Sequence, residues 1–232
     1  MLAEYYRKRA AEYDAFYADP ARQADLAVLR DWLAGLTRGR RILEVAAGTG
    51  YWTATAAPVA AAITATDINA ETLAIAGNRQ PGAHVTLLRA DAWNLPLLPE
   101  RFDLGMAHLW WSHLRKRDRA AFLARFATHL EPGATLLMID ETLVANVGAP
   151  ISRRDADGDT WQRRWLANGE RFEIVKNYPD AAELAQSVGE ACEDVRVLEL
   201  KHFWALSAKF LPHPLPRSAR EGVGRGCTVR PI

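Results

Sequence analysis

The fold of this chain is decided by the stretch Ile42-Leu-Glu-Val-Ala-Ala-Gly-Thr-Gly-Tyr-Trp-Thr53. A short apolar strand over residues 41–45 runs into a turn that carries two glycines, and a helix is predicted from Trp52 to Ala61. Glycine permits a tight turn and lets the main chain approach a ligand closely. A helix that begins at such a turn presents free N–H groups and the positive end of its dipole to anionic groups. The stretch therefore indicates a ligand-binding turn, and a plain glycine turn without a ligand is the alternative.

The same order of elements repeats on the C-terminal side of this turn. Strands are predicted over residues 62–66, 85–89, 102–107 and 135–139, the last after a Pro132-Gly133 turn, and helices over residues 71–79 and 118–130. On the N-terminal side, leucines recur at helical spacing before residue 40, at Leu26, Leu29, Leu33 and Leu36. Strands that alternate with helices imply right-handed crossovers and a parallel sheet covered on both faces. The first 140 residues therefore predict a doubly wound α/β unit.

The remainder of the chain follows a different pattern. Residues 152–159 are polar and turn-rich, and the segments 161–166 and 171–175 flank Asn168-Gly169, a dipeptide favoured in type I′ hairpin turns. A helix over 180–188 and strands over 195–200 and 203–207 are predicted next. Beyond Lys209 prolines, glycines and arginines follow without periodicity, which favours a disordered tail over 210–232, although an altered reading frame would look similar. We expect one domain over 1–209, with a helical segment 1–40 and a hairpin inserted over 142–178.

Composition and charge exclude several classes of protein. The chain has 232 residues, 49% of them apolar and 25% charged, and 29 basic residues against 28 acidic ones give a net charge of +1. This composition predicts a folded globular protein without the basic footprint of nucleic-acid or anionic-membrane binding. The N-terminus lacks the apolar core of a signal peptide, and the uncharged stretch 45–66 is too rich in alanine and threonine for a membrane span. Two cysteines, Cys192 and Cys227, without a Cys/His cluster argue against a zinc site and a disulfide framework and fit a reducing cytoplasm.

Acidic residues follow the second and third predicted strands. Asp67 lies 19 positions after Gly48, where a carboxylate can accept both hydrogen bonds of a ribose diol, although it could instead cap the next helix. Asp91 could contact an adenine amino group or be a surface turn residue. Because these features follow successive strand ends in order, a nucleoside ligand explains them together. NAD is the poorer choice, since Thr53 replaces the third glycine of its G-x-G-x-x-G fingerprint and a bulky Tyr51-Trp52 pair follows the second.

The turn after the first predicted strand resembles a motif of a known family. Glu44-Val-Ala-Ala-Gly-Thr-Gly50 is similar to the acidic-x-G-x-G-x-G motif of class I S-adenosylmethionine-dependent methyltransferases of the small-molecule type, with Ala46 in place of the first glycine. The segments that resemble the later motifs of the family are Ala65-Thr-Asp-Ile68, Ala90-Asp-Ala92, Phe102 to Ala107 and Leu130-Glu-Pro-Gly-Ala-Thr-Leu-Leu137. The opening Tyr5-Tyr6 with Ala11-Glu-Tyr-Asp14 resembles the segment that closes over the cofactor in that family, and the resemblance extends to about Ser207.

The resemblance implies a Rossmann-like seven-stranded sheet with an antiparallel last strand, a helical lid over 1–40 and a hairpin cap. It also implies S-adenosylmethionine as cofactor. The main chain of residues 46–50 would hold its methionine part, Glu44 would reach the ammonium, Asp67 the ribose and Asp91 the adenine amine, with Ile68 and Ala92 against the adenine faces. The full set of expected cofactor-binding residues is Tyr13, Glu44, Ala46, Ala47, Gly48, Gly50, Trp52, Asp67, Ile68, Asp91, Ala92 and Ala107.

The predicted reaction is methyl transfer to an oxygen or nitrogen atom of a small molecule by in-line displacement. A hydroxyl acceptor needs a general base, and His113 stands where many small-molecule members of the family carry histidine, although it could simply pack against a helix. The expected substrate residues are Tyr5, His108, Trp110 and Trp111; consecutive tryptophans cannot both face the core of a helix. Cap residues of interest are Arg153, Trp161 and Trp165.

Two other functions stay open at this point. The chain could be a non-catalytic subunit that binds S-adenosylmethionine, or, with less support, a Rossmann NAD-dependent oxidoreductase. We expect a cytoplasmic monomer or homodimer whose partner is a small-molecule substrate, without nucleic acid, membrane or metal.

Overall fold

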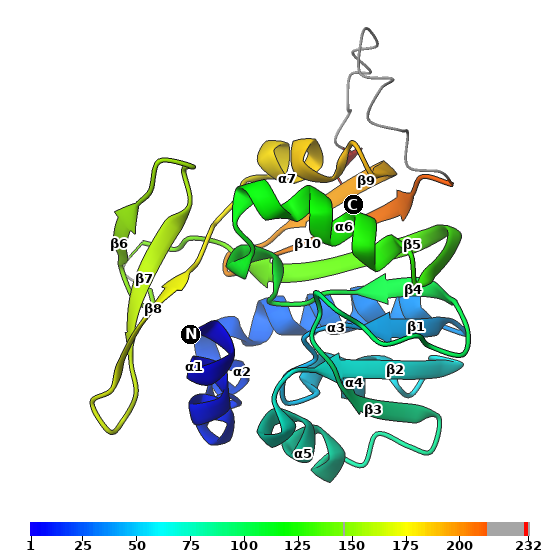
Figure 1. Ribbon diagram of the computed structural model, residues 1–232, viewed down its shortest axis with the longest axis horizontal. Coiled ribbons are helices and arrows are strands. Elements are labelled where there is room, and N and C mark those ends of the chain that lie inside the picture. The colour runs from blue at the N-terminus through cyan, green and yellow to red at the C-terminus, as the bar shows by residue number, and fades with distance from the viewer. Residues whose placement is uncertain (146, 213–229, 232) are drawn as a thin grey trace, which may run out of the picture.

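The computed structural model describes residues 1–145, 147–212 and 230–231 and is dominated by a mixed sheet (Figure 1). The strand order is β11-β9-β10-β5-β4-β1-β2-β3. Five strands run parallel, namely β1 (Arg41–Glu44), β2 (Ala62–Asp67), β3 (Val85–Arg89), β4 (Phe102–Met106) and β5 (Leu130–Glu141). The strand β10 (Phe203–Phe210) lies antiparallel between β5 and β9 (Cys192–Glu199). The predicted α/β sheet with an antiparallel last strand is therefore confirmed.

One short strand extends this sheet beyond the seven expected ones. Arg230–Pro231 form β11, which pairs in parallel with β9. The expectation of a disordered tail concerns residues 210–232, of which 213–229 and 232 lie outside the described residues.

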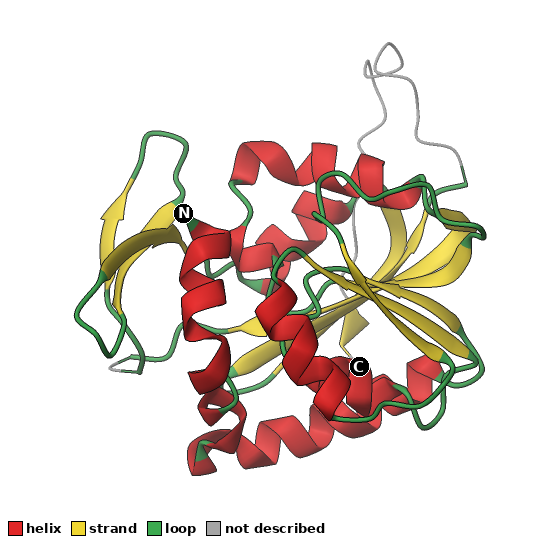
Figure 2. Ribbon diagram, turned by 60° about the horizontal axis from the view of Figure 1, so that its bottom comes forward, coloured by secondary structure: helices red, strands yellow, loops and turns green. Residues whose placement is uncertain are grey.

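The helices cover both faces of the sheet (Figure 2). One core packs the sheet against α3 (Gln23–Thr37) and α4 (Tyr51–Ala56), and the other packs it against α6 (Arg119–Ala127) and α7 (Ala181–Val188). Successive side chains of a strand point to opposite faces, so Leu136 and Met138 lie in the second core while Leu137 and Ile139 lie in the first. The helix α5 (Ala70–Asn78) packs on β2 and β3.

Element boundaries differ from the expectation most at α4 and β5. The helix α4 ends at Ala56, five residues earlier than predicted, shortly before Pro58, which has no N–H to continue a helix. The strand β5 begins at Leu130, so that Pro132 lies within the strand, and a register shift against β4 absorbs the irregularity. The expected Pro132-Gly133 turn is thus an irregular start of β5.

A second, three-stranded sheet stands beside the main body at the left of Figure 1. It consists of β6 (Ile151–Arg154), β7 (Thr160–Trp165) and β8 (Arg171–Val175), all antiparallel. The inserted hairpin is confirmed, and β6 is an addition that the polar composition of residues 152–159 did not indicate. A type I′ turn needs positive φ at both central residues, but in the loop 166–170 only Gly169 has one, and the main-chain N–H of Leu166 donates to the carbonyl of Glu170. The loop therefore has three residues rather than two.

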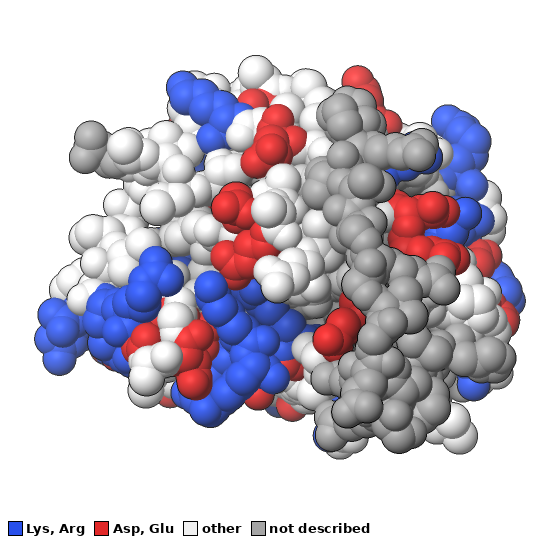
Figure 3. Space-filling view, turned by 90° about the horizontal axis from the view of Figure 1, so that it is seen from above, with Lys and Arg blue, Asp and Glu red and all other residues white. Residues whose placement is uncertain are grey.

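The N-terminal segment comprises α1 (Leu2–Arg9), η1 (Ala10–Glu12), α2 (Ala15–Ala18) and η2 (Pro20–Arg22), where η denotes a 3-10 helix. It lies between the second sheet and α5: Tyr5 packs against Phe172 and Ile174, and the Asn69 amide donates to the carbonyl of Ala3. None of the helices in the described ranges combines the length and apolar content needed to span a bilayer. On the face seen in Figure 3, basic and acidic side chains are interspersed, in keeping with the small net charge.

Candidate functional site

A cavity of about 350 Å³ opens at the carboxyl ends of β1, β2 and β4. In open α/β sheets, ligands bind beyond the carboxyl ends of the strands. The walls come from the turns after β1, β2, β3 and β4 and from the N-terminal segment. The cavity thus gathers residues that are far apart in the sequence at one edge of the sheet.

The turn after β1 is held in left-handed backbone conformations. The φ angles of Ala46, Gly48 and Gly50 are 53°, 58° and 74°. A Cβ atom on Gly50 would lie 2.7 Å from the Cβ of Ala76, so this glycine lets α4 pack closely on α5. The residues of this turn that line the cavity are Ala46, Ala47, Gly48 and Thr49, all of them small. Of the three residues with positive φ, only Ala46 has a side chain.

Asp67, at the end of β2, ties this turn to the next one. Its Oδ2 accepts a hydrogen bond of 2.9 Å from the main-chain N–H of Gly48, and its Oδ1 accepts one of 2.8 Å from that of Asn69. Burial raises the pKa of this carboxyl, while the hydrogen bonds from Asn69 and Gly48 act in the opposite direction. Asn69 occupies the N-cap position of α5, so Asp67 orders the loop before the helix and does not occupy the cap position itself.

Glu44 and Asp91 complete the acidic lining of this cavity. Glu44 is buried and accepts a 2.6 Å hydrogen bond from the hydroxyl of Thr53. Burial raises the pKa of Glu44 to about 8. Asp91 accepts a 2.9 Å hydrogen bond from the main-chain N–H of Trp93, which fixes the turn after β3.

Several buried nitrogens that line the cavity have no hydrogen-bond partner among the described residues. They are both ring nitrogens of His108 and the indole N–H groups of Trp52 and Trp110. Burial lowers the pKa of His108 to about 3, so its ring is neutral. Leaving a buried donor unsatisfied costs about 1–3 kcal/mol, and a polar ligand in the cavity would supply the missing partners.

A second cavity of about 310 Å³ shares four wall residues with the first: Tyr6, Tyr13, Leu109 and His113. Its other walls come from the N-terminal segment, the loop after β5, and β7 with the residues that follow β8. The two cavities therefore meet at these four residues.

His113, in η3 (Trp111–His113), is buried and held at both ring nitrogens. Nδ1 lies 2.7 Å from the carbonyl oxygen of Val175 and Nε2 lies 2.7 Å from the hydroxyl of Tyr6. Because a carbonyl can only accept, Nδ1 carries the proton and Nε2 has the free lone pair. Burial and the nearby Lys176 lower the pKa of His113 to about 4, so the ring is neutral near pH 7. Burial raises the pKa of Tyr6 to about 12, so its hydroxyl donates to Nε2.

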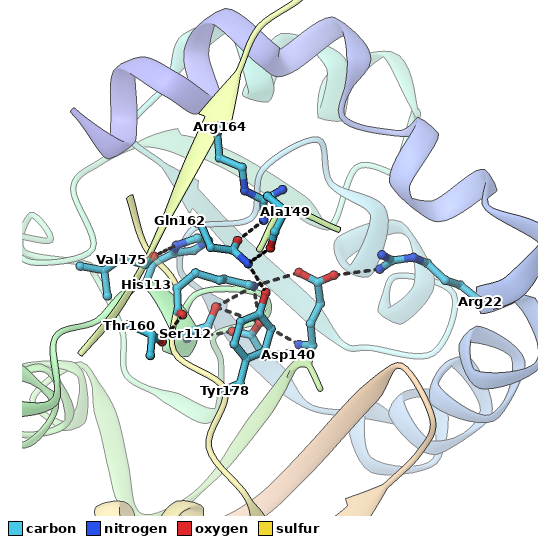
Figure 4. A network of polar contacts seen from close by, with 12 residues as sticks. Arg22, Ser112, His113, Asp140, Ala149, Thr160, Gln162, Arg164, Val175 and Tyr178 are labelled. Carbon is cyan, nitrogen blue, oxygen red and sulfur yellow. Dashed lines mark hydrogen bonds and ion pairs between the residues drawn. The ribbon is translucent and has the colours of Figure 1, made fainter. Parts of the chain in front are cut away.

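A buried polar network fixes the position of η3 (Figure 4). Asp140 accepts from the main-chain N–H and the hydroxyl of Ser112, both at 2.9 Å, and from Nζ of Lys176 at 3.0 Å. Lys176 also donates to the hydroxyl of Ser112 at 2.8 Å and pairs with Glu141 at 3.0 Å. The network joins η3 to β5 and to the end of β8.

The structure brings together most of the residues that were expected to bind the cofactor. Around the first cavity lie Tyr13, Glu44, Ala46, Ala47, Gly48, Trp52, Asp67, Ile68, Asp91 and Ala92. Gly50 and the buried Ala107 do not line it.

The residues expected at the substrate are divided between the cavity and the core. His108 and Trp110 line the first cavity, whereas Trp111 lies in the core beneath α6 and Tyr5 packs against the second sheet. Neither Trp111 nor Tyr5 lines either of the two cavities.

The expected cap residues make local contacts of their own. The guanidinium of Arg153 pairs with Glu173 and lies 4.0 Å from the ring centroid of Trp161, and Trp165 is 60% exposed. Asp155 lies within 4.8 Å of two further carboxylates at the β6–β7 turn, but its Oδ1 accepts main-chain N–H groups of that turn.

Several polar residues of the second cavity were not expected at a site from the sequence, among them Arg9, Arg164, Lys176 and Tyr178, and Tyr6 was expected only as part of the segment that closes over the cofactor. The available sequence signal for Lys176 was its position directly after the strand segment Phe172 to Val175. The ring centroids of Tyr6 and Tyr13, seven positions apart in the sequence, are separated by 5.7 Å. This spacing of seven positions was the sequence signal that Tyr6, rather than Tyr5, lies at the cavity beside Tyr13.

Comparison with known proteins finds similarity to methyltransferases. Residues 42–133 match a family described as "Methyltransferase domain". This part of the chain, which holds β1 to β4 and the turns after them, is therefore similar to methyltransferase domains. A solved structure named "DhpI-SAH complex structure" is 29% identical with a TM-score of 0.73, covering 91% of this chain and 96% of that one. A second, named "DhpI-SAM-HEP complex", is 28% identical with a TM-score of 0.71, covering 88% and 94%.

Among curated proteins, the chain is 34% identical over 122 residues to a demethylmenaquinone methyltransferase of Tropheryma whipplei (strain Twist). The match covers 52% of this chain and 50% of the relative, so the chain spans about half the length of the curated relatives it matches.

Proposed function

We propose that the protein is an enzyme that transfers a methyl group from S-adenosylmethionine to an oxygen or nitrogen atom of a small molecule. The observation that carries the proposal is the pair of cavities that meet at His113, one of them ringed by Glu44, Asp67 and Asp91 at successive strand ends. The names of the two solved structures that are 29% and 28% identical support the choice of cofactor.

The first cavity suits each part of this cofactor. Asp67 keeps lone pairs for the ribose hydroxyls beyond its two main-chain hydrogen bonds, and Asp91 would accept from the adenine amine. Ile68 and Ala92 would flank the adenine ring. The main chain after β1 and the carboxylate of Glu44 would hold the methionine part, and the unpartnered nitrogens of the cavity would gain polar partners there.

The cofactor supplies an activated methyl group on a sulfonium, so the residues of this chain mainly position the acceptor and exclude water. Well-oriented reactants contribute about 7–11 kcal/mol to lowering the barrier. The carbonyl of Val175 holds the proton of His113 on Nδ1, so Nε2 carries a lone pair. Nε2 would therefore accept the proton of the acceptor hydroxyl. General-base catalysis contributes roughly 10²–10⁴-fold. Tyr6 holds the lone pair until the acceptor displaces it.

An alternative acceptor comes from the curated relatives, which are named for demethylmenaquinone. A quinone of that kind is flat and apolar, whereas the second cavity is lined by arginine, lysine and carboxylate side chains. The lining therefore favours a polar acceptor. Cys192 is buried and forms no disulfide with another described residue, which fits our proposal that the enzyme works in the reducing cytoplasm.

The test is a screen for S-adenosylhomocysteine release from S-adenosylmethionine against a library of small hydroxyl and amino compounds. We expect turnover with at least one polar class, and we expect His113→Ala to lower kcat by roughly 10²-fold or more without changing the Kd of the cofactor. A protein that binds the cofactor but releases no product with any member would be a non-catalytic subunit. Binding of NAD in preference to S-adenosylmethionine would instead support an oxidoreductase.

A further inference from the structure

The charges that line the second cavity do not cancel. Among the residues that the structure describes, its lining includes four cationic side chains but only two carboxylates, Asp19 and Glu141. The cations are Arg9, Arg22, Arg164 and Lys176. This excess of positive charge sits beside His113, where we place the methyl acceptor.

Two of these cations are already neutralised by carboxylates. Lys176 pairs with Asp140 and Glu141, both at 3.0 Å, and Arg22 pairs with Glu141 at 3.0 Å and with Asp19 at 3.4 Å. Burial acts to raise the pKa of Glu141, but the neighbouring Lys176 and Arg22 lower it to about 2. This carboxylate therefore stays ionised. These charges balance one another inside the protein.

The other two cations, Arg9 and Arg164, form no ion pair with any carboxylate of residues 1–145 and 147–212. Arg9 donates to the hydroxyl of Tyr5 and lies 5.7 Å from the ring centroid of Tyr13. Arg164 donates from Nη2 to Oε1 of Gln162 at 2.6 Å. Their positive charges are therefore available to a ligand in the cavity.

The side chain of Gln162 orients Arg164 and Tyr178 together (Figure 4). Its Nε2 donates to the hydroxyl of Tyr178 at 2.9 Å and to the carbonyl of Ala149, and its Oε1 receives Arg164. Because the Tyr178 oxygen accepts from Gln162, its own O–H is free to donate to a ligand. Gln162 is buried, so both donors are held by a fixed side chain.

Two buried nitrogens on this cavity lack a partner among the described residues. They are Nε of Arg164 and Nε2 of His202. An unsatisfied buried donor costs about 1–3 kcal/mol, and an arginine fork matches the geometry of a carboxylate or phosphate. The missing partner of Arg164 is thus a hydrogen-bond acceptor, and the surplus charge requires an anion.

We propose that the methyl acceptor carries an oxyanion, a carboxylate or a phosphorus oxyacid, which Arg164 binds together with Tyr178 and Arg9 while the acceptor atom lies at His113. This inference rests on the proposed methyl transfer and adds the substrate class. The acceptor is compact, because the anion and the acceptor atom share a cavity of about 310 Å³.

Binding of such an anion would also act on the base. Burial is the main cause of the low pKa of His113, and Lys176 and Arg164 lower it further, against the opposite effect of Asp140. An anion on Arg164 would offset part of that positive field and make Nε2 a stronger base. Acceptors that carry the negative charge would therefore have a higher kcat as well as a lower KM.

The experiment uses the full chain and a panel of matched pairs. Each pair is an ω-hydroxyalkyl carboxylate or phosphate with two to four carbons and its uncharged carboxamide or alcohol. Product release is measured at saturating S-adenosylmethionine, and binding of each compound to the S-adenosylhomocysteine-saturated protein is measured by calorimetry. The variant is Arg164→Gln, with Arg164→Lys as the charge-retaining form. The matched control is Arg163→Gln, because Arg163 lies next to it on β7, is half-exposed and pairs with Glu173.

We expect charged members to bind and react, and uncharged partners to lose at least a hundredfold in kcat/KM. Arg164→Gln should raise KM for the charged members at least tenfold, Arg164→Lys should do so less, and Arg163→Gln should leave KM unchanged. Equal use of charged and uncharged partners, or equal effects of the two glutamine variants, would overturn the oxyanion subsite and leave the methyltransferase proposal intact. Failure of all charged members to bind a protein that does bind S-adenosylhomocysteine would also overturn it. Failure to bind S-adenosylhomocysteine would overturn the proposed function itself.

Discussion

Ala46 is the residue at which this chain departs from the glycine-rich motif that it resembles, and its backbone is strained as a result. A non-glycine residue in the left-handed region is strained by about 1–2 kcal/mol, and Ala46 has a φ of 53°. Two substitutions in the turn should therefore affect stability differently.

We expect Ala46→Gly to leave the free energy of unfolding unchanged or raise it by up to about 1 kcal/mol, because relief of strain is partly offset by the greater freedom of glycine in the unfolded chain. Gly50→Ala should lower it by about 2 kcal/mol or more, since it adds strain and a clash with Ala76. Urea unfolding of the three proteins measures both changes. A destabilising Ala46→Gly would contradict this reading of the turn.

His113 determines the expected pH dependence of the reaction. The base is active when neutral, so activity is retained above its pKa and lost as pH falls through that value. Burial, with Lys176 and Arg164, lowers the pKa of His113 to about 4, while Asp140 opposes the shift. We expect kcat/KM for a hydroxyl acceptor to stay level from pH 8 down to about 5.5 at saturating cofactor. A half-maximal rate near pH 6.5 would show an ordinary, solvated histidine instead.

Glu44 should couple cofactor binding to proton release. Burial raises its pKa to about 8, so at pH 7 the empty site holds the protonated carboxyl, and an ammonium group would stabilise the carboxylate. We expect S-adenosylhomocysteine binding at pH 7 to release close to one proton, measured by calorimetry in buffers of different ionisation enthalpy. Glu44→Gln should bind more weakly and abolish the release. Identical proton release by the two proteins would exclude Glu44 as its source.

At the scale of elements, the N-terminal segment connects the cofactor cavity to the second sheet. The ring of Tyr17 stacks on Tyr51 at 3.8 Å, and Asp14 accepts from the hydroxyl of Thr49 at 2.6 Å and pairs with Arg79. Arg79 in turn donates to the carbonyl of Thr49 at 2.7 Å. These contacts fasten the segment onto the turn after β1, which lines the cavity.

Weakening this attachment should speed the escape of the cofactor. We expect Asp14→Asn to raise the dissociation rate of S-adenosylhomocysteine roughly two- to fivefold, the effect of a partly exposed ion pair, with a smaller change in the association rate. Stopped-flow tryptophan fluorescence provides both rates. Glu12→Gln, at an exposed neighbouring position, should leave them unchanged. A dissociation rate of Asp14→Asn equal to that of the parent would show that the segment does not control release.

At the scale of the whole molecule, the sequence predicted the main sheet because strand and helix periodicities are local. The alternation of Leu136 to Ile139 between the two cores is visible in the sequence as an unbroken apolar run, which is typical of a strand buried on both faces. The strand β6 was missed because its residues, Ile151 to Arg154, are largely polar and its pairing with β7 is a tertiary feature.

The cofactor cavity was largely predictable because its residues directly follow strand ends. The second cavity was not, since Arg164, Lys176 and Arg9 come from three separate elements that meet only in the folded chain. Tyr5 and Tyr6 illustrate the same limit: adjacent helical residues point in different directions, and only the packing of α1 places Tyr6, not Tyr5, at His113.

The measurement that tests the central claim most directly is calorimetric titration of the full chain with S-adenosylhomocysteine, repeated on Asp67→Ala and Asp67→Asn. We predict micromolar or tighter binding by the parent protein, a roughly ten- to hundredfold loss in a folded Asp67→Ala from the missing charged hydrogen bonds, and a smaller loss in Asp67→Asn. Absence of binding by the folded parent protein, or equal affinity in all three proteins, would contradict the account.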